Sequence, residues 1–379
     1  MLFKSCRLPS KAAFFFSQPP GFSATLAAAV LLCACSAGAT RPDISESPSF
    51  FSVDSLGGKT LIVSISPFDG SRDSLIIEGK VGSVVCMSST AVAAFAELGC
   101  SDMVRGVSGK RFISNPLVSS NPLVKDVGSD AAPDYETIVS LKPDLVLAYA
   151  VSSVLPPYVE RLNSLGIRTL ILYDNFESHP LARAAYIRLA GALAACPERA
   201  DSVFGSISAS YRHIRDSLGN AVEGARPGVL VNAPYADAWY IPGKRSYMYR
   251  LVWDAGAEIL GAAESSLSST ISIEQALDIS RRADFWLHPG NARTRKELLS
   301  MHPFFGLFLR PGLRIYNNTL RMNPGGGNDF YERGAVRPDL VLNDLKNIFL
   351  SGYSEPVCAS DCPQEADSVW KSEYYLEVE

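Results

Sequence analysis

The sequence predicts an α/β protein built from two similar lobes. Three observations carry this prediction: strand and helix patterns alternate along most of the chain, one helix-and-strand unit occurs twice, and a long helical pattern separates the two halves. Such alternation is typical of α/β domains with a mainly parallel sheet.

The repeated unit is the most informative of the three. In its first copy, Asp134 is followed two places later by Glu136, then by a short amphipathic helix and an apolar strand at residues 145–147. In its second copy, Ser272 and Glu274 hold the same places before a strand at residues 285–287. Asp and Ser are favoured N-cap residues, so each copy predicts a capped helix that leads into a buried strand.

The two glutamates allow two interpretations. A carboxylate in the first turn stabilises the helix dipole by roughly 0.3–1 kcal/mol, and Ser272 with Gln275 matches a capping box. As a pair, Glu136 and Glu274 would also place two separated negative charges at equivalent points of two lobes. That arrangement suits a partner with two basic sockets.

The remaining segments follow the same alternation. A helical pattern from 180 to 218, interrupted by Gly191 and Pro197, predicts one or two helices between the lobes. A turn at residues 67–70 predicts a hairpin. The predicted strands are residues 60–65, 74–78, 84–87, 104–107, 145–148, 169–172 and 229–231, and further helices are expected up to Gly99 and at 157–165 and 340–350.

Length and charge exclude some classes of protein. The 379 residues, 47% of them hydrophobic, suffice for two ordinary cores, since a domain usually has about 100–150 residues. A formal net charge of −4 provides no basic surface for nucleic acid.

The N-terminus has the pattern of an export signal. A positively charged start precedes an apolar core at residues 22–32, and the following Leu-Cys-Ala-Cys resembles the bacterial lipobox. That resemblance implies cleavage before Cys35 and a lipid on its thiol, whereas plain secretion is the alternative. The apolar stretch is too short for a good membrane span, so the mature protein is expected to be held at the membrane by lipid alone.

Five cysteines remain outside the signal. Cys86 and Cys100 lie in apolar surroundings and are expected to pack as small hydrophobic residues, and Cys196 is expected to stay unpaired. Cys358 and Cys362 could close a small disulfide loop in an oxidising compartment.

Several short motifs, in their order along the chain, resemble the periplasmic binding proteins for iron complexes and cobalamin. The motifs are Val-Cys-Met-Ser at 85–88, Val-Gly at 127–128, Leu-Lys-Pro-Asp-Leu-Val at 141–146, Leu-Gly-Ile at 165–167 and the two glutamate units. The resemblance covers about residues 80–350. It implies two similar Rossmann-like lobes joined by a long rigid α-helix, with a ligand cleft between the lobes.

The resemblance also implies a function. The protein would be the solute-binding lipoprotein of an ABC importer, would capture a ferric siderophore or haem, and would reach the permease and its ATPase through Glu136 and Glu274. Cobalamin is the alternative ligand. The protein would have no cofactor of its own and would be a lipid-anchored monomer in the periplasm of a Gram-negative bacterium.

Ligand contacts are expected on the loops at the strand ends that face the cleft. Phe112 and Tyr149 occupy places where cobalamin binders of the family put aromatic rings. Aromatic, basic and amide side chains recur on the other cleft loops, although packing or solvated surface charge could explain each of them alone. The candidate ligand-binding residues are Phe112, Tyr149, Trp239, Arg245, Asn323 and Arg333.

A catalytic function is the competing class. An exported lipoprotein hydrolase would need a nucleophile, but no Gly-x-Ser-x-Gly elbow surrounds any Ser, and no His-x-x-x-His pattern occurs. Neither a catalytic residue nor a metal ligand set is therefore predicted, although His288 could reach the cleft and serve haem. The expected organisation is a lipoprotein signal peptide (1–34), a spacer (35–58), an N-terminal lobe (59–176), a connecting helix (177–220), a C-terminal lobe (221–350) and a tail (351–379).

Overall fold

The computed structural model describes residues 44–218, 226–235, 238–351 and 370–379. All of them belong to one compact unit, Thr40–Glu379. The predicted signal peptide, the lipidation site Cys35 and the Cys358 and Cys362 pair lie outside the described residues.

A three-stranded antiparallel sheet opens the described chain. Its strands are β1 (Phe51–Leu56), β2 (Lys59–Ile65) and β3 (Arg72–Ile77), in the order β1-β2-β3. The predicted hairpin is confirmed as β2 and β3. The expected spacer is wrong for residues 51–56, because Phe51 is buried and β1 pairs along its whole length with β2.

The N-terminal lobe holds a five-stranded parallel sheet in the order β6-β5-β4-β7-β8. The strands are β4 (Val84–Cys86), β5 (Val104–Val107), β6 (Lys125–Asp126), β7 (Leu145–Tyr149) and β8 (Thr169–Leu172). The helices between them are α1 (Ser89–Glu97), η1 (Ser101–Met103), η2 (Lys110–Phe112), α2 (Pro116–Ser119), α3 (Tyr135–Leu141) and α4 (Pro157–Ser164), with η3 (Asp174–Phe176) after the last strand.

The C-terminal lobe repeats the order of four of these parallel strands and adds an antiparallel edge strand. Its main sheet has the order β12-β9-β14-β15-β16. The strands β9 (Gly228–Val231), β12 (Glu258–Ile259), β14 (Phe285–Leu287) and β15 (Arg314–Asn317) are parallel, and β16 (Leu376–Glu377) is antiparallel to β15. A small antiparallel sheet joins β10 (Pro234–Tyr235), β11 (Ala238–Ile241) and β13 (Ser269–Ile271). The helices are α8 (Tyr247–Asp254), α9 (Ile273–Ser280), α10 (Arg295–Met301), α11 (Phe305–Phe308), α12 (Arg333–Val336) and α13 (Pro338–Leu350).

The two glutamate units occupy equivalent places in the two sheets. Helix α3 leads into β7, which pairs with the lobe's first parallel strand, β4, and α9 leads into β14, which pairs with β9 in the same way. The predicted caps are present, since Asp134 accepts from the Thr137 amide at 3.0 Å and Ser272 with Gln275 forms the capping box. The prediction of two similar α/β lobes is therefore confirmed.

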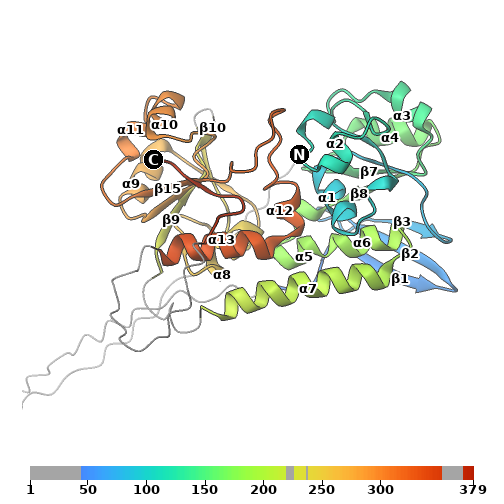
Figure 1. Ribbon diagram of the computed structural model, residues 1–379, viewed down its shortest axis with the longest axis horizontal. Coiled ribbons are helices and arrows are strands. Elements are labelled where there is room, and N and C mark those ends of the chain that lie inside the picture. The colour runs from blue at the N-terminus through green and yellow to red at the C-terminus, as the bar shows by residue number, and fades with distance from the viewer. Residues whose placement is uncertain (1–43, 219–225, 236–237, 352–369) are drawn as a thin grey trace, which may run out of the picture. The chain divides into compact units, whose positions relative to one another are not determined.

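The segment between the lobes is not one helix. It forms α5 (Pro180–Ala184), α6 (Tyr186–Leu193) and the 20-residue α7 (Pro197–Asp216), which packs against α6 and α13 (Figure 1). The break follows from Ala195, whose φ of 52° leaves the helical region, and from Pro197, which can start a helix but cannot continue one. Only α7 thus matches the long helix expected over 177–220.

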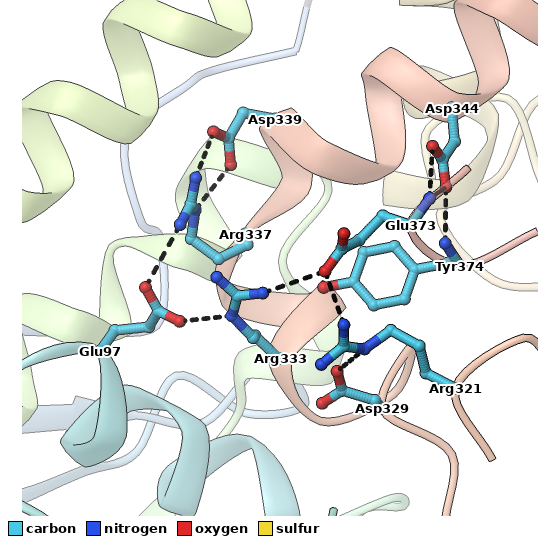
Figure 2. A network of polar contacts seen from close by, with 9 residues as sticks. All are labelled: Glu97, Arg321, Asp329, Arg333, Arg337, Asp339, Asp344, Glu373 and Tyr374. Carbon is cyan, nitrogen blue, oxygen red and sulfur yellow. Dashed lines mark hydrogen bonds and ion pairs between the residues drawn. The ribbon is translucent and has the colours of Figure 1, made fainter. Parts of the chain in front are cut away.

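The C-terminal residues belong to the C-terminal lobe. Strand β16 (Leu376–Glu377) pairs antiparallel with β15, and Tyr374 and Tyr375 are buried. The carboxylate of Asp344 accepts from the Tyr374 amide at 2.7 Å and from the Glu373 amide at 3.0 Å (Figure 2). No helix in the described part of the chain is both long and apolar enough to span a bilayer.

Candidate ligand-binding site

A cavity of about 550 Å³ is lined by residues of both lobes. The N-terminal lobe contributes Ser88, Ser89, Thr90, Phe112, Tyr149 and Asn175, and the C-terminal lobe contributes Met322, Gly326, Gly327, Asn328 and Tyr331. Arg183 comes from α5, in the segment between the lobes. Most of these residues lie on loops at the ends of parallel strands or at the start of a helix, where α/β folds place their ligands.

Three hydroxyl side chains line the cavity at the start of α1. The Ser88 hydroxyl caps the helix by accepting a hydrogen bond from the Thr90 amide at 3.2 Å. The hydroxyl oxygens of Ser88 and Thr90 are 2.8 Å apart. The N-terminus of a helix carries partial positive charge and free N–H groups. This end of the cavity therefore suits oxygen atoms or a negative charge on a ligand.

Aromatic rings form other parts of the lining. The Phe112 ring is 43% exposed, and the Arg111 guanidinium lies 4.4 Å from its centroid. The Tyr149 hydroxyl donates to Asp130 at 2.9 Å, and burial together with this bond raises the pKa of Tyr149 to about 12. Tyr149 is thus a neutral phenol at physiological pH. Phe112 and Tyr149 both line the cavity, and their contact with a ligand stays a prediction.

The charged residues that line the cavity neutralise each other. Arg183 and Asp174 form an ion pair at 3.2 Å, with side chains 12% and 6% exposed. Because both charges are engaged, the lining offers mostly uncharged polar and aromatic groups.

The glycine-rich loop at 323–328 in the C-terminal lobe contacts the N-terminal lobe. Asn323 donates through Nδ2 to the carbonyl oxygen of Ile113 at 3.0 Å and accepts from the Gly327 amide at 2.8 Å. A Cβ atom at Gly327 would collide with the Phe112 carbonyl oxygen. The glycines therefore permit close backbone approach, and the Asn323 amide, expected to hold ligand, is bonded within the protein instead.

Glu332 makes a second contact between the lobes. Its carboxylate accepts from the amides of Ser114 at 2.7 Å and Asn115 at 2.9 Å. The side chain is 2% exposed, and burial raises the pKa of Glu332 to about 7.

Arg333 belongs to an ionic network rather than to the cavity lining. Its Nε donates to Glu97 of α1 at 2.8 Å and its Nη1 to Glu373 at 3.2 Å, while Arg337 contacts the other oxygen of Glu97 at 3.4 Å and also pairs with Asp339 (Figure 2). Arg333 does not line the cavity. The expected ligand contact is therefore replaced by a structural bond to the other lobe.

Trp239 corrects another sequence prediction. The side chain is fully buried, donates through Nε1 to the Val231 carbonyl at 2.7 Å and stacks on Phe308. A residue with no exposed surface cannot contact a ligand in this conformation, so Trp239 is a core residue. Arg245 is exposed next to Ser246, which lines a second cavity, and its ligand contact stays a prediction.

The second cavity, of about 310 Å³, shares Asn175 and Tyr331 with the first. His288 lines it in a left-handed conformation with φ of 59°, and its Nε2 lies 2.9 Å from the Tyr375 hydroxyl. Burial lowers the pKa of His288 to about 4, so the imidazole is neutral. In the described ranges, no three His, Cys, Asp or Glu side chains converge in a way that could hold a metal ion.

Glu136 and Glu274 are both exposed in the first turns of α3 and α9. Neither carboxylate forms an ion pair with a residue that the structure describes. A hydrogen bond from Ser272 lowers the pKa of Glu274, which keeps that carboxylate charged.

Sequence reasoning missed part of the lining. Asn175 follows β8 closely, so the rule that ligands lie at strand ends could have identified it. Met87 also follows a strand directly, but its apolar neighbours in the sequence predict a core residue. The sequence did not predict that Met322 lines the cavity, because its position depends on how the 323–328 loop folds against the other lobe.

Known proteins resemble this chain in sequence and in fold. A family model described as periplasmic binding protein matches residues 84–306. An uncharacterized lipoprotein of Methanocaldococcus jannaschii is 21% identical over 72% of this chain and 66% of its own length. An uncharacterized ABC transporter substrate-binding lipoprotein of Bacillus subtilis is 23% identical over 61% of this chain and 68% of its own. The chain thus spans about two thirds of these relatives.

A solved structure shows the same fold. A periplasmic heme binding protein from Pseudomonas aeruginosa superposes with a TM-score of 0.56 at 18% identity, over 79% of this chain and 98% of that one. A sequence identity of 18% supports a shared fold and no more. The family model is stronger evidence for membership, because it matches more than half of the sequence. This chain belongs to the periplasmic binding protein family.

Proposed function

We propose that this protein is the solute-binding lipoprotein of an ABC importer and that it captures an iron complex, either a ferric siderophore or haem. The observation that carries the proposal is the cavity lined by both lobes, with aromatic rings, uncharged hydroxyls and one internally neutralised ion pair. The substrate-binding role of the Bacillus subtilis relative and the heme ligand of the Pseudomonas aeruginosa protein support it.

The lining fits such a ligand in two ways. Phe112, Tyr149 and Tyr331 offer ring faces or edges to a conjugated or aromatic chelate. The hydroxyls and N–H groups at the start of α1 can bind carboxylate or hydroxamate oxygens without a buried cation. The iron would arrive inside its chelate as cargo, so the protein would hold no cofactor of its own.

Cobalamin is the second candidate, and the second cavity favours it. Because the two cavities share Asn175 and Tyr331, a ligand larger than haem could extend from one into the other. A corrinoid with its nucleotide tail is such a ligand.

The partner would be an ABC permease with its ATPase, docked through Glu136 and Glu274. The two carboxylates are exposed, lack internal ion pairs within the described ranges and sit at equivalent points of two similar lobes. Two basic sockets on the permease would satisfy both charges. In this scheme Cys35 carries the lipid that anchors the monomeric protein to a membrane.

Absorbance spectroscopy can identify the ligand. Purified protein is mixed with haem, with ferric siderophores or with cobalamin and then desalted, and the retained spectrum identifies what is bound. Phe112→Ala is expected to weaken binding about five- to hundredfold, as loss of one good aromatic contact costs about 1–3 kcal/mol. Phe304→Ala is the matched control, since Phe304 is similarly exposed at 46% but lines neither cavity. Retention of none of the three ligands would refute the proposal.

Uptake measurements test the docking role separately. Charge reversal at Glu136 and Glu274 to Arg is expected to leave ligand affinity unchanged and to lower uptake by the cognate permease, most strongly in the double variant. Glu160→Arg is the control, because Glu160 is also an exposed glutamate in a first helical turn. Normal uptake by the double variant would rule out docking through these two residues.

A further inference from the structure

One ion pair supplies the charge on the wall of the larger cavity. In the described ranges, Asp174 and Arg183 are the only charged side chains that line it, and Nε of Arg183 lies 3.2 Å from Oδ2 of Asp174. Both side chains are largely buried, and the Arg183 guanidinium also lies 4.9 Å from the centroid of the Tyr247 ring. The two charges therefore cancel, and a bound ligand meets a wall without net charge.

The groups around this pair do not make the cavity positive. Tyr149 and Tyr331 are neutral phenols, because burial raises the pKa of both. Next to the lining, the Arg111 guanidinium beside the Phe112 ring is exposed to water. The exposed Asp130 carboxylate, which accepts from the Tyr149 hydroxyl at 2.9 Å, carries the opposite charge. The start of α1 contributes about half an elementary charge, which stabilises a single oxygen atom but cannot balance a multiply charged anion.

The second cavity supplies no cation from the described part of the chain either. Among the residues described, Glu177 and His288 are its acidic and basic lining residues. The Glu177 carboxylate accepts from the amides of Ser49 at 3.0 Å and Phe50 at 3.1 Å, and the His288 imidazole is neutral. A ligand that extends from one cavity into the other therefore meets no unpaired positive charge on these walls.

We propose that Asp174, by neutralising Arg183, restricts the site to chelates without net negative charge. This selectivity rests on the proposed function, capture of an iron complex, and narrows its ligand class. An anion that leaves water for a cavity without opposite charge loses hydration that nothing replaces. Ferric tris-hydroxamates meet the condition, because three singly charged groups cancel the charge of the ferric ion. Ferric tris-catecholates do not, since three doubly charged groups leave the complex with three negative charges.

Two pairs of probes test the selectivity on the wild-type protein. One pair is a ferric tris-hydroxamate without other charged groups and a ferric tris-catecholate of similar size, and the other is haem dimethyl ester and haem with its two ionised propionates. Quenching of tryptophan fluorescence measures each dissociation constant, and the uncharged member of a pair should bind about tenfold more tightly or better. Equal or tighter binding of an anionic member would overturn the selectivity and leave capture of an iron complex standing. Binding of none of the four would refute capture of an iron complex, and the selectivity with it.

Substitution of Asp174 tests its role directly. Asp174→Asn leaves the Arg183 charge for the ligand, so affinity for the ferric tris-catecholate should rise about ten- to hundredfold, as expected for one hydrogen bond to a charged group. Loss of a merely structural contact would not raise the affinity for any ligand. The double variant Asp174→Asn/Arg183→Gln removes both charges and should lose this gain. A folded Asp174→Asn protein without the gain would overturn the role of Asp174.

Two further variants complete the test. Asn175→Arg adds a cation to the same wall and should show a similar gain for the tris-catecholate, even if Asp174→Asn does not fold. Asp201→Asn is the matched control, because Asp201 also pairs with an arginine but does not line the cavity. The control should keep the selectivity of the wild type. Absence of a gain in Asn175→Arg, or an equal gain in Asp201→Asn, would contradict selection by the charge of the cavity wall.

Discussion

Replacing Glu97 by Gln tests whether the network in Figure 2 holds the lobes together. The substitution keeps the shape of the side chain and removes the charge that faces Arg333 at 2.8 Å and Arg337 at 3.4 Å. The Glu97 side chain is 16% exposed and its two partners are 33% and 22% exposed, so the contacts are partly shielded from water.

The free energy of unfolding that Glu97→Gln is expected to lose lies between two limits. A hydrogen bond to a charged group contributes about 1.5–3 kcal/mol when shielded, whereas an exposed ion pair contributes about 0.2–1 kcal/mol. Arg333 keeps Glu373 and Arg337 keeps Asp339, so neither cation becomes an unpaired buried charge. Glu97→Gln is therefore expected to lower the free energy of unfolding by about 1–2 kcal/mol.

Urea unfolding followed by circular dichroism and by tryptophan fluorescence measures this loss. Asp201→Asn is the matched control, because its ion pair with Arg188 spans 2.7 Å but the side chains are 63% and 43% exposed. The control should lose less than about 1 kcal/mol. Equal losses in the two variants, or no loss in Glu97→Gln, would refute the reasoning that burial makes this network structural.

Three further predictions follow from individual residues. Burial raises the pKa of Glu177 and of Glu332 from 4.5 to about 7, so the folded state holds protons that the unfolded state has released, and the free energy of unfolding should fall as pH rises from about 4.5 to 7. Glu332→Gln should reduce this pH dependence in urea unfolding, and an unchanged slope would contradict the raised pKa. Trp239→Ala should cost about 3–5 kcal/mol of stability as a core truncation, and a stable variant that lost only ligand affinity would restore Trp239 to the binding site. Cys35→Ala should release the protein from the membrane fraction with ligand binding intact, and continued membrane association would argue against the lipid anchor.

The fold was predictable from the sequence because local patterns determine it. The caps at Asp134 and Ser272 and the apolar strands that follow them are properties of neighbouring residues, and both units fold as their patterns indicate. The break at Ala195 was harder to foresee, since a positive φ at an alanine is set by tertiary packing and not by propensity.

The site was only partly predictable, for a physical reason. Phe112 and Tyr149 line the cavity, and their place could be predicted because the end of a parallel strand determines where its loop must lie. Trp239 and Arg333 have the residue types of ligand contacts, but aromatic rings also fill cores and guanidinium groups also join lobes. Only the positions of Phe308 and Glu97, both distant in sequence, decide between these roles.

The contacts between the lobes also bear on how ligand can enter and leave. Asn323 bonds to Ile113, Glu332 to Ser114 and Asn115, and Arg333 to Glu97, so wide separation of the lobes would break all of these bonds together. At about 1–3 kcal/mol for each buried polar group left unpaired, such an opening would cost a large part of a typical domain's stability. Ligand exchange on the free protein is therefore expected to use small movements of loops at the cavity. Wider opening would need an external source of energy, which ATP hydrolysis by the importer would supply under the proposed function.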